Sequence, residues 1–252
     1  MFKKFVKTVL AGSLAVGLAA CGSSTSDDSD VYEIGCDAKY APFSMEVDGT
    51  YVGIDVEILD AVAQVEGFEY NLTPMDFSGI IPGLSSGQLD GAIAGISVTE
   101  ERKATVDFSD GYYDSALALI VKNDNSAITS LDDLDGTSAA VKKGTRGATF
   151  AEEFADTYGF SITYYDDSPS MFLAVQNGNN DFLLEDYPVI SYQINEGIQT
   201  GLKVAVETVG DGVPYAFAVK KGENQDLLNM FNDGLATIKE NGTYDEILSK
   251  YI

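Results

Sequence analysis

Two successive series of strand-like and helix-like segments limit what this 252-residue chain can fold into. In each series, short apolar runs alternate with amphipathic stretches that have helical periodicity. This β-α-β-α-β order predicts α/β sheets with mostly parallel strands. The expected strands are 31–36, 68–72, 91–96, 117–121, 138–141, 162–165, 182–184, 202–206 and 215–219, and the expected helices are 55–66, 80–86, 147–158, 170–176, 188–195, 225–240 and 243–250.

The segment 1–20 has the pattern of a bacterial export signal. Three lysines precede an apolar run, 8–20, that is too short to be a good membrane span. The run ends in Leu18-Ala-Ala-Cys21, which resembles the cleavage box of bacterial lipoproteins. We therefore expect Cys21 to carry a lipid such as palmitate, and the polar segment 21–30 to be a flexible tether. The alternative is an ordinary secretory signal in which this cysteine is incidental.

Composition excludes several classes of function. The chain has no histidine, which removes Ser-His-Asp and Cys-His catalysis and every His-ligated zinc site. Once Cys21 is acylated, Cys36 is the remaining cysteine, so neither an intrachain disulfide nor a cysteine metal site can form. The formal charge of −25 would repel nucleic acid and anionic lipid surfaces. We expect no metal and no cofactor.

The stretch 98–113 is charged, aromatic and interrupted by small residues. Its one arginine, Arg102, lies among five carboxylates of the sequence. A guanidinium held in this way suits a fork-to-fork grip on a ligand carboxylate. The alternative is a solvated loop that carries surface ion pairs, which contribute little. The carboxylates are Glu100, Glu101, Asp107, Asp110 and Asp114.

Polar and aromatic side chains follow the ends of strands in both series. In open α/β sheets, ligands bind beyond the carboxyl ends of the strands. We therefore expect a site between two lobes, to which both series contribute. The strand-end residues are Asp37, Tyr40, Phe77, Ser97, Arg102, Lys142, Thr145, Arg146, Glu185 and Asp186.

This set of groups is complementary to a small zwitterion. Arg102, Ser97 and backbone N–H groups could take a carboxylate, and Asp186 could take an ammonium. Tyr40 and Phe77 could form the walls around the ligand side chain. Structural alternatives are open for each element: the two rings could be core residues, Asp186 could cap a helix, and the loop 144–147 could merely start one.

Six motifs together resemble the polar amino acid-binding proteins of ABC importers. The resemblance spans 31–252 in the family's order and implies a two-lobed type II periplasmic-binding-protein fold, with a ligand cleft between the lobes. The chain would cross between lobes near 114–117 and 207–215, with lobe one at 31–114 plus 216–252 and lobe two at 115–215. The motifs are Tyr40-Ala-Pro-Phe-Ser44, Tyr51-Val-Gly-Ile-Asp-Val-Glu57, Met75-Asp-Phe-Ser-Gly-Ile-Ile-Pro82, Ser97-Val-Thr-Glu-Glu-Arg-Lys103, Val106-Asp-Phe-Ser-Asp-Gly-Tyr-Tyr113 and Asn241-Gly-Thr-Tyr-Asp245.

The resemblance also implies a role for individual residues. Arg102 is similar to the family's α-carboxylate clamp, and Asp186 to its α-ammonium anchor. One departure is Arg146, which stands where members often have a small residue, and which would either add a carboxylate contact or point to solvent. The other implied contacts are Gly95 and Ser97 on the ligand head, Tyr40 and Phe77 flanking the ligand, Asp37 and Lys142 toward its side chain, and Thr145 and Glu185 nearby.

The ligand side chain is a separate question. Asp37 with Glu185 favours a cationic side chain, whereas Lys142 would repel one. An acidic and a basic group together suit an amide, so glutamine is expected first, with arginine, lysine or histidine as the alternative.

The resemblance implies capture by lobe closure and delivery to an ABC permease in the membrane, by a monomer held at the outer face of the bacterial cytoplasmic membrane. Two other functions stay open: a ligand sensor, and a prephenate-type dehydratase with Glu185 as general acid.

Overall fold

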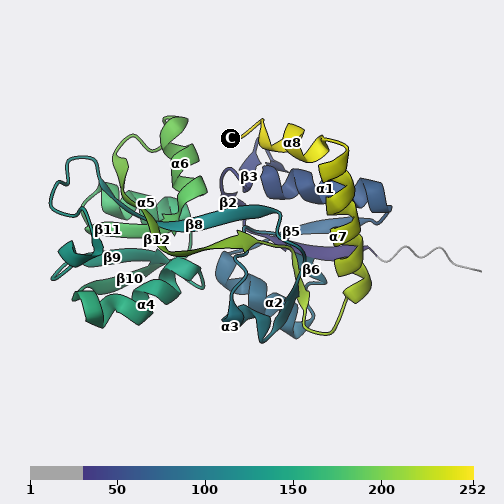
Figure 1. Ribbon diagram of the computed structural model, residues 1–252, viewed down its shortest axis with the longest axis horizontal. Coiled ribbons are helices and arrows are strands. Elements are labelled where there is room, and N and C mark those ends of the chain that lie inside the picture. Colours follow the sequence, from purple (N-terminus) through teal and green to yellow (C-terminus); the bar gives the residue numbers. More distant parts are fainter. Residues whose placement is uncertain (1–30) are drawn as a thin grey trace, which may run out of the picture.

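The computed structural model describes residues 31–252. The predicted export signal, the lipidated Cys21 and the tether therefore lie outside the described residues. Within them, helices and strands alternate along two five-stranded sheets that stand side by side (Figure 1).

The first sheet combines strands from the beginning and the end of the described chain. Its order is β5-β1-β6-β13-β7, with β1 parallel to β5 and β6, and β13 antiparallel to β6 and β7. Helix α1 contacts α7, and α8 contacts both. The strands are β1 (Tyr32–Cys36), β5 (Tyr70–Pro74), β6 (Gly91–Ala92), β7 (Val106–Phe108) and β13 (Ala218–Lys220), and the helices are α1 (Ile54–Glu66), α2 (Ile80–Ser86), α3 (Glu100–Lys103), α7 (Gln225–Glu240) and α8 (Thr243–Leu248).

The second sheet is formed by the middle of the chain, in the order β10-β9-β11-β8-β12. Strands β10 and β11 are each parallel to β9, whereas β8 runs antiparallel to β11 and β12. The strands are β8 (Tyr113–Lys122), β9 (Ser138–Lys142), β10 (Ser161–Tyr165), β11 (Phe182–Asp186) and β12 (Leu202–Tyr215), and the helices are α4 (Arg146–Tyr158), α5 (Ser168–Gln176) and α6 (Tyr187–Asn195).

Two long strands connect the sheets. β8 and β12 pair from Tyr113 and Tyr215 to Lys122 and Leu202, with shifts of register along the way. The sequence pattern predicted a shorter 117–121 strand and separate strands at 202–206 and 215–219. The structure instead has one 14-residue strand from Leu202 to Tyr215, and the strand predicted at 215–219 is found as β13, at Ala218–Lys220. Polar residues in the middle of β12 interrupt the apolar pattern from which strands were predicted. They are nevertheless extended, because β12 pairs with β8 along most of its length.

The first lobe also contains short elements that periodicity did not predict. A small sheet is formed by β2 (Lys39–Tyr40), β3 (Ser44–Val47) and β4 (Thr50–Val52), and a 3-10 turn covers Phe77–Gly79. Two- to four-residue strands are too short to give a periodic signal. As a result, Tyr40 lies in β2, shortly after the end of β1, and Phe77 lies in the 3-10 turn, shortly after the end of β5.

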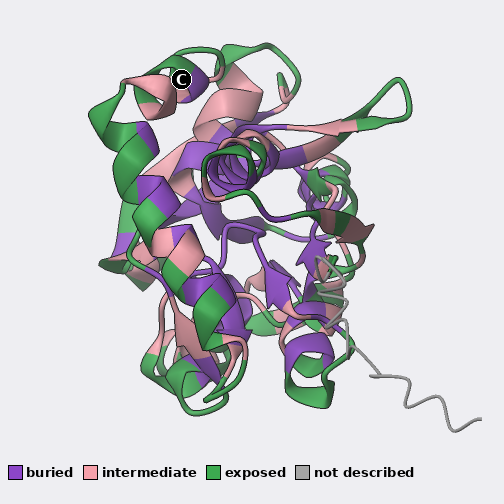
Figure 2. Cartoon of the chain, turned by 90° about the vertical axis from the view of Figure 1, so that its right-hand side faces the viewer, coloured by how far each residue is buried: buried purple, intermediate pink, exposed green. Residues whose placement is uncertain are grey.

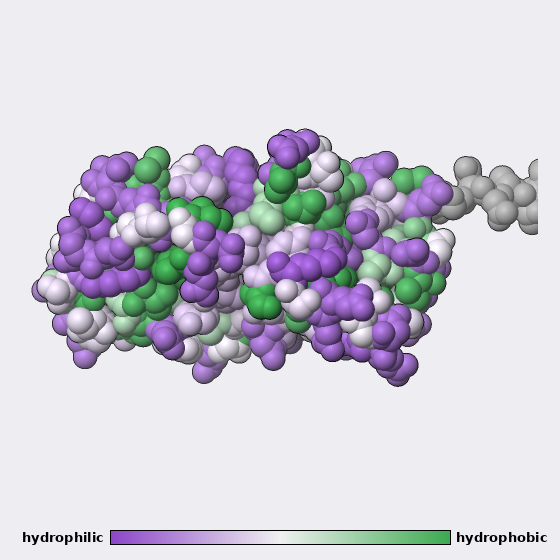
Figure 3. All heavy atoms as spheres, turned by 90° about the horizontal axis from the view of Figure 1, so that it is seen from above, coloured by the Kyte–Doolittle hydropathy of each residue, from purple (hydrophilic) through white to green (hydrophobic). Residues whose placement is uncertain are grey.

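The core consists of buried sheet residues and the inner faces of the helices (Figure 2). Apolar side chains of both sheets are fully buried, as in Ile34 and Phe217 of the first and Leu119 and Val141 of the second. Seen from above, hydrophilic residues cover most of the surface and hydrophobic ones are interspersed (Figure 3). None of the helices within 31–252 has the length and apolar character that crossing a bilayer requires.

Candidate functional site

Arg102 is a buried residue with its guanidinium facing the second sheet. The four-residue helix α3 holds it, and the Thr99 hydroxyl caps that helix by accepting from the Arg102 N–H at 3.2 Å. Nη1 donates to the Ser97 carbonyl at 2.8 Å, and Nη2 donates to the Gly144 carbonyl at 3.0 Å. Because only 9% of Arg102 is exposed, the alternative of a solvated surface loop is wrong for this residue. Burial lowers the pKa of the guanidinium, and the charge of Asp186 opposes that effect.

The carboxylates next to Arg102 in the sequence are not its partners. Within 31–252, no ion pair joins Arg102 to a carboxylate within 4.0 Å. Glu100 instead accepts from Lys103 at 2.7 Å, and Asp107 accepts from the Gly222 N–H at 2.8 Å. The buried guanidinium is therefore free of a neutralising acid in direct contact.

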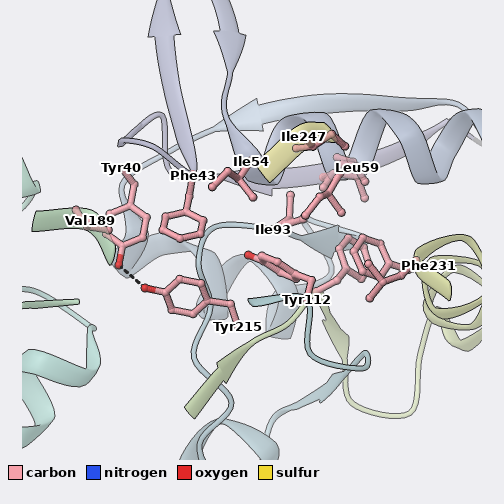
Figure 4. Packing of buried hydrophobic residues seen from close by; sticks show 14 of the residues in the cluster. Tyr40, Phe43, Ile54, Leu59, Ile93, Tyr112, Val189, Tyr215, Phe231 and Ile247 are labelled. Atoms are coloured by element: carbon pink, nitrogen blue, oxygen red, sulfur yellow. Dashed lines mark hydrogen bonds between the residues drawn. The ribbon is translucent and has the colours of Figure 1, made fainter. Parts of the chain in front are cut away.

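Asp186 lies at the end of β11 and accepts hydrogen bonds from two buried tyrosines. Its Oδ2 receives the Tyr40 hydroxyl at 2.7 Å and the Tyr215 hydroxyl at 2.6 Å. The two hydroxyls also point toward each other, 3.0 Å apart (Figure 4). Asp186 is the N-cap residue of α6, yet its side chain makes no capping bond. Its carboxylate is thus turned into the cleft, and Oδ1 is buried without a hydrogen-bond partner.

Asp37 and Lys142 form a buried ion pair between the two lobes. Lys142 Nζ lies 2.8 Å from Asp37 Oδ2, and the residues are 1% and 3% exposed. The ammonium also lies over the rings of Tyr40 and Phe77, 4.2 and 5.3 Å from their centroids. Tyr40 and Phe77 are therefore core residues whose rings also face a buried cation, and their role as walls around a ligand stays a prediction.

Glu185 is a buried carboxyl next to this pair. It accepts the Ser168 hydroxyl at 2.7 Å and the Asp186 N–H at 2.9 Å. Burial raises its pKa to about 7, although the charge of Lys142 works in the opposite direction. Near neutral pH this side chain is therefore divided between a proton-donating and a charged form.

Gly95 occupies a sharp turn three residues after the end of β6. Its φ of +56° is the left-handed conformation that favours glycine, and a Cβ there would lie 2.5 Å from Cε1 of Tyr40. The strand predicted at 91–96 ends at Ala92 instead, and the turn at Gly95 follows within the predicted range. The Gly95 N–H donates to buried Asp55 at 2.8 Å, and Asp55 also accepts the Tyr112 hydroxyl at 2.6 Å.

Thr145 and Arg146 begin helix α4. The Thr145 hydroxyl accepts from the Ala148 N–H at 3.3 Å and donates to the Lys142 carbonyl at 2.7 Å. The loop therefore does start a helix, as one alternative held. Arg146 Nη1 donates to the Asp211 carbonyl at 2.7 Å, and Nη2 lies 3.6 Å from Asp186 Oδ1. The side chain is 14% exposed, so it lies mostly inside the cleft.

A cavity of about 420 Å³ lies between the lobes beside both arginines. Phe77, Thr99, Gly144 and the two guanidinium residues contribute to its lining. A second cavity of about 700 Å³ lies beside Asp37 at the small sheet. A third, of about 900 Å³, lies against the crossing strands and the C-terminal residues, away from the predicted site residues. The part of the chain from 31 to 252 has no group of three or more metal-ligating side chains placed to hold an ion.

The structure adds residues that sequence reasoning missed. Each of them forms a hydrogen bond with a predicted site residue: Tyr215 with Asp186, Asp55 and Tyr112 with Gly95, and Ser168 with Glu185. The Tyr40 to Tyr215 contact joins residues 175 positions apart. No local pattern reports such a contact, although the expected crossover near residue 215 placed that segment at the lobe boundary.

Comparison with known proteins gives a consistent picture. The family described as bacterial extracellular solute-binding proteins, family 3, matches residues 32–252. One relative is the "Arginine-binding extracellular protein ArtP" of Bacillus subtilis, 30% identical over 99% of this chain and 98% of that protein.

Two similar solved structures are states of an ancestral arginine-binding protein. One is bound to arginine, with 35% identity, a TM-score of 0.82, and coverage of 88% of this chain and 98% of that one. The other is bound to glutamine, with 35% identity, a TM-score of 0.81, and coverage of 88% and 97%.

Proposed function

Because the chain belongs to the family 3 bacterial extracellular solute-binding proteins of amino acid ABC transporters, we propose that it captures a polar amino acid and delivers it to a membrane permease. The observation that carries this proposal is the set of buried, opposite charges between the two sheets. Arg102 supplies a carboxylate donor, and the Asp186 carboxylate lies in the same cleft with one oxygen unpartnered. Such a set is costly to bury unless a complementary zwitterion occupies it.

The assignment of residues follows the chemistry of this zwitterion. Arg102, with Gly95 and Ser97, is the proposed carboxylate side of the site. Asp186 is the proposed ammonium anchor, supported by the hydroxyls of Tyr40 and Tyr215. The wall and side-chain region comprises Phe77, Asp37, Lys142, Thr145 and Glu185.

Closure of two lobes is the proposed mechanism. We place lobe one at 31–114 plus 216–252 and lobe two at 115–215, with β8 and β12 as the hinge. The two separate five-stranded sheets support this division, and three contacts join the two parts: Asp37 to Lys142, Arg102 to Gly144, and Tyr40 to Asp186. Closing the cleft excludes water, which strengthens charge-assisted hydrogen bonds to the ligand.

Glutamine is the ligand that we propose first. The Asp37 carboxylate is already neutralised by Lys142, so the site offers no free acid from this pair to a cationic side chain. Glu185, with its pKa raised to about 7 by burial, can donate to or accept from an amide. A neutral, hydrogen-bonding side chain fits this arrangement.

A cationic amino acid is the second candidate, favoured by the names of relatives. ArtP of Bacillus subtilis is named for arginine. The ancestral protein is described with arginine in one structure and with glutamine in another, so this type of scaffold accommodates both. The identity of the group at position 142 is the feature that separates the two candidates here.

A thermal-shift panel of the twenty amino acids on refolded, ligand-free protein tests the proposal. A ligand that binds only the folded state raises the melting temperature, so glutamine should produce the largest shift. Replacing Lys142→Leu should move the preference toward arginine or lysine, because a ligand cation would then neutralise Asp37. The neighbouring Lys143→Leu is the control, since Lys143 pairs with exposed Asp166. No shift with any amino acid would contradict the proposal.

We also propose that the protein is a monomer anchored by lipid at Cys21 outside the cytoplasmic membrane. Metabolic labelling with a palmitate analogue, lost in Cys21→Ser, tests the anchor. A sensor role would show as ligand binding without transport, and a dehydratase role as turnover that Glu185→Gln abolishes.

A further inference from the structure

Three buried polar atoms without hydrogen-bond partners meet on one side of the cleft. They are Nε and Nη2 of Arg146 and Oδ1 of Asp186. Asp186 is 8% exposed, and the Arg146 side chain is 14% exposed, so bulk water does not readily satisfy them. Buried donors and acceptors are normally paired, so buried polar atoms without a partner call for an explanation, and binding of a polar ligand is one.

The other bonds of both side chains hold these atoms in place. Arg146 Nη1 donates to the Asp211 carbonyl of the crossing strand β12 at 2.7 Å. Oδ2 of Asp186 is held by two tyrosine hydroxyls. The free atoms of Arg146 are Nε and Nη2, which lie on one edge of the guanidinium and form the fork that binds a carboxylate through two parallel hydrogen bonds.

The distance between the unpartnered atoms of Arg146 and Asp186 fits the ammonium and carboxylate groups of an α-amino acid. Arg146 Nη2 and Asp186 Oδ1 lie 3.6 Å apart, which is too long for a direct hydrogen bond. The ammonium and carboxylate of an α-amino acid are both attached to Cα, so they can bridge this gap. The ligand ammonium would take Oδ1 and the ligand carboxylate would take the fork, giving a ring of alternating charges.

Resting on the proposed capture of an amino acid, we infer that Arg146 is a second carboxylate-binding residue that selects ligands with a free α-carboxylate. It complements Arg102, whose Nη1 and Nη2 each donate to a backbone carbonyl. Both guanidinium residues line the same cavity of about 420 Å³. The two arginines approach the carboxylate from opposite lobes, so this contact also favours closure.

Titration calorimetry with matched ligand pairs tests this inference. The probes are L-glutamine and L-glutaminamide, and L-arginine and L-argininamide, which differ in the α-carboxylate. Arg146→Ala should weaken binding of the amino acid about 10- to 100-fold, and should weaken the amide much less. Arg146→Lys, which keeps the charge but not the fork, should fall between the two. The control is Lys143→Ala, which removes the same charge from an exposed position of this loop.

The outcomes separate the inference from the function on which it rests. Unchanged or tighter amino acid binding by Arg146→Ala, with an intact thermal transition, overturns the inference. Tighter binding would mean that Arg146 does not bind the ligand carboxylate and instead competes with the ligand ammonium for the Asp186 carboxylate. Failure of the wild-type protein to bind any amino acid of the thermal-shift panel overturns the proposed function itself, and the inference with it.

Discussion

At the scale of single residues, the titration of one buried carboxyl, Glu185, sets the charge of the side-chain region. Its pKa is raised to about 7 by burial, against an ordinary value of 4.5. The folded protein thus keeps this proton in a pH range in which the unfolded chain has released it. The unfolding free energy consequently falls as the pH rises from about 4.5 to 7.

Glu185→Gln should remove this contribution to the pH dependence. Between pH 4.5 and 7, the slope of unfolding free energy against pH should become less negative by up to about 1.4 kcal/mol per pH unit. Denaturant unfolding at several pH values measures it. Glu153→Gln, at an exposed glutamate, is the control and should keep the wild-type slope. Identical slopes in Glu185→Gln and wild type would contradict the assignment.

Arg102→Ala should reduce ligand affinity by about 2–5 kcal/mol, because a buried ligand carboxylate would lose its main partner. The loss should be smaller in Arg102→Lys, which keeps the charge. Calorimetric titration with the best ligand of the panel measures both. Wild-type affinity in Arg102→Ala would refute its role as the clamp.

At the scale of elements, periodicity predicted the regular parts of the fold and missed the parts that build the site. The expected helices at 80–86 and 225–240 are confirmed to the residue, and the helix predicted at 55–66 begins one residue earlier, at Ile54. By contrast, 91–96 was predicted as a strand, whereas β6 ends at Ala92 and the chain turns at the left-handed Gly95. The Asp55 to Gly95 and Tyr40 to Tyr215 contacts depend on how distant segments pack, which residue order alone does not reveal.

Thr145 tests whether a predicted site residue acts mainly through its helix. Because its hydroxyl caps α4, Thr145→Ala should cost about 1 kcal/mol of unfolding free energy, and Thr145→Ser should restore most of it. Thermal and denaturant unfolding of ligand-free protein measures the cost. A stable Thr145→Ala variant that has lost ligand affinity would instead indicate a direct ligand contact.

At the scale of the whole molecule, closure depends on contacts between lobes that differ in exposure. The Asp37 to Lys142 pair is buried, whereas Lys39 and Asp167 form an exposed pair at 2.9 Å across the same cleft. Salt screens exposed charges much more than buried ones. Of these two pairs, the Lys39 pair should therefore be the one that makes closure sensitive to ionic strength.

Lys39→Ala should weaken ligand binding by at most about 1 kcal/mol, and should remove part of the salt dependence of affinity. Titrations at low and high salt measure this. Lys122→Ala is the matched control, since Lys122 pairs with Asp124 within one lobe at 3.4 Å. An equal effect of both variants would rule out a contribution of the Lys39 pair to closure.

The most direct test of the central claim is a calorimetric titration of refolded, ligand-free protein with L-glutamine and L-arginine side by side. Since the buried Asp37 to Lys142 pair leaves no free acid from these two residues for a cationic side chain, glutamine should bind at least about tenfold more tightly. Tighter binding of arginine would contradict the assignment of a neutral ligand. If neither amino acid binds, the thermal-shift panel identifies another ligand. The absence of a melting-temperature shift with all twenty amino acids would contradict amino acid capture itself.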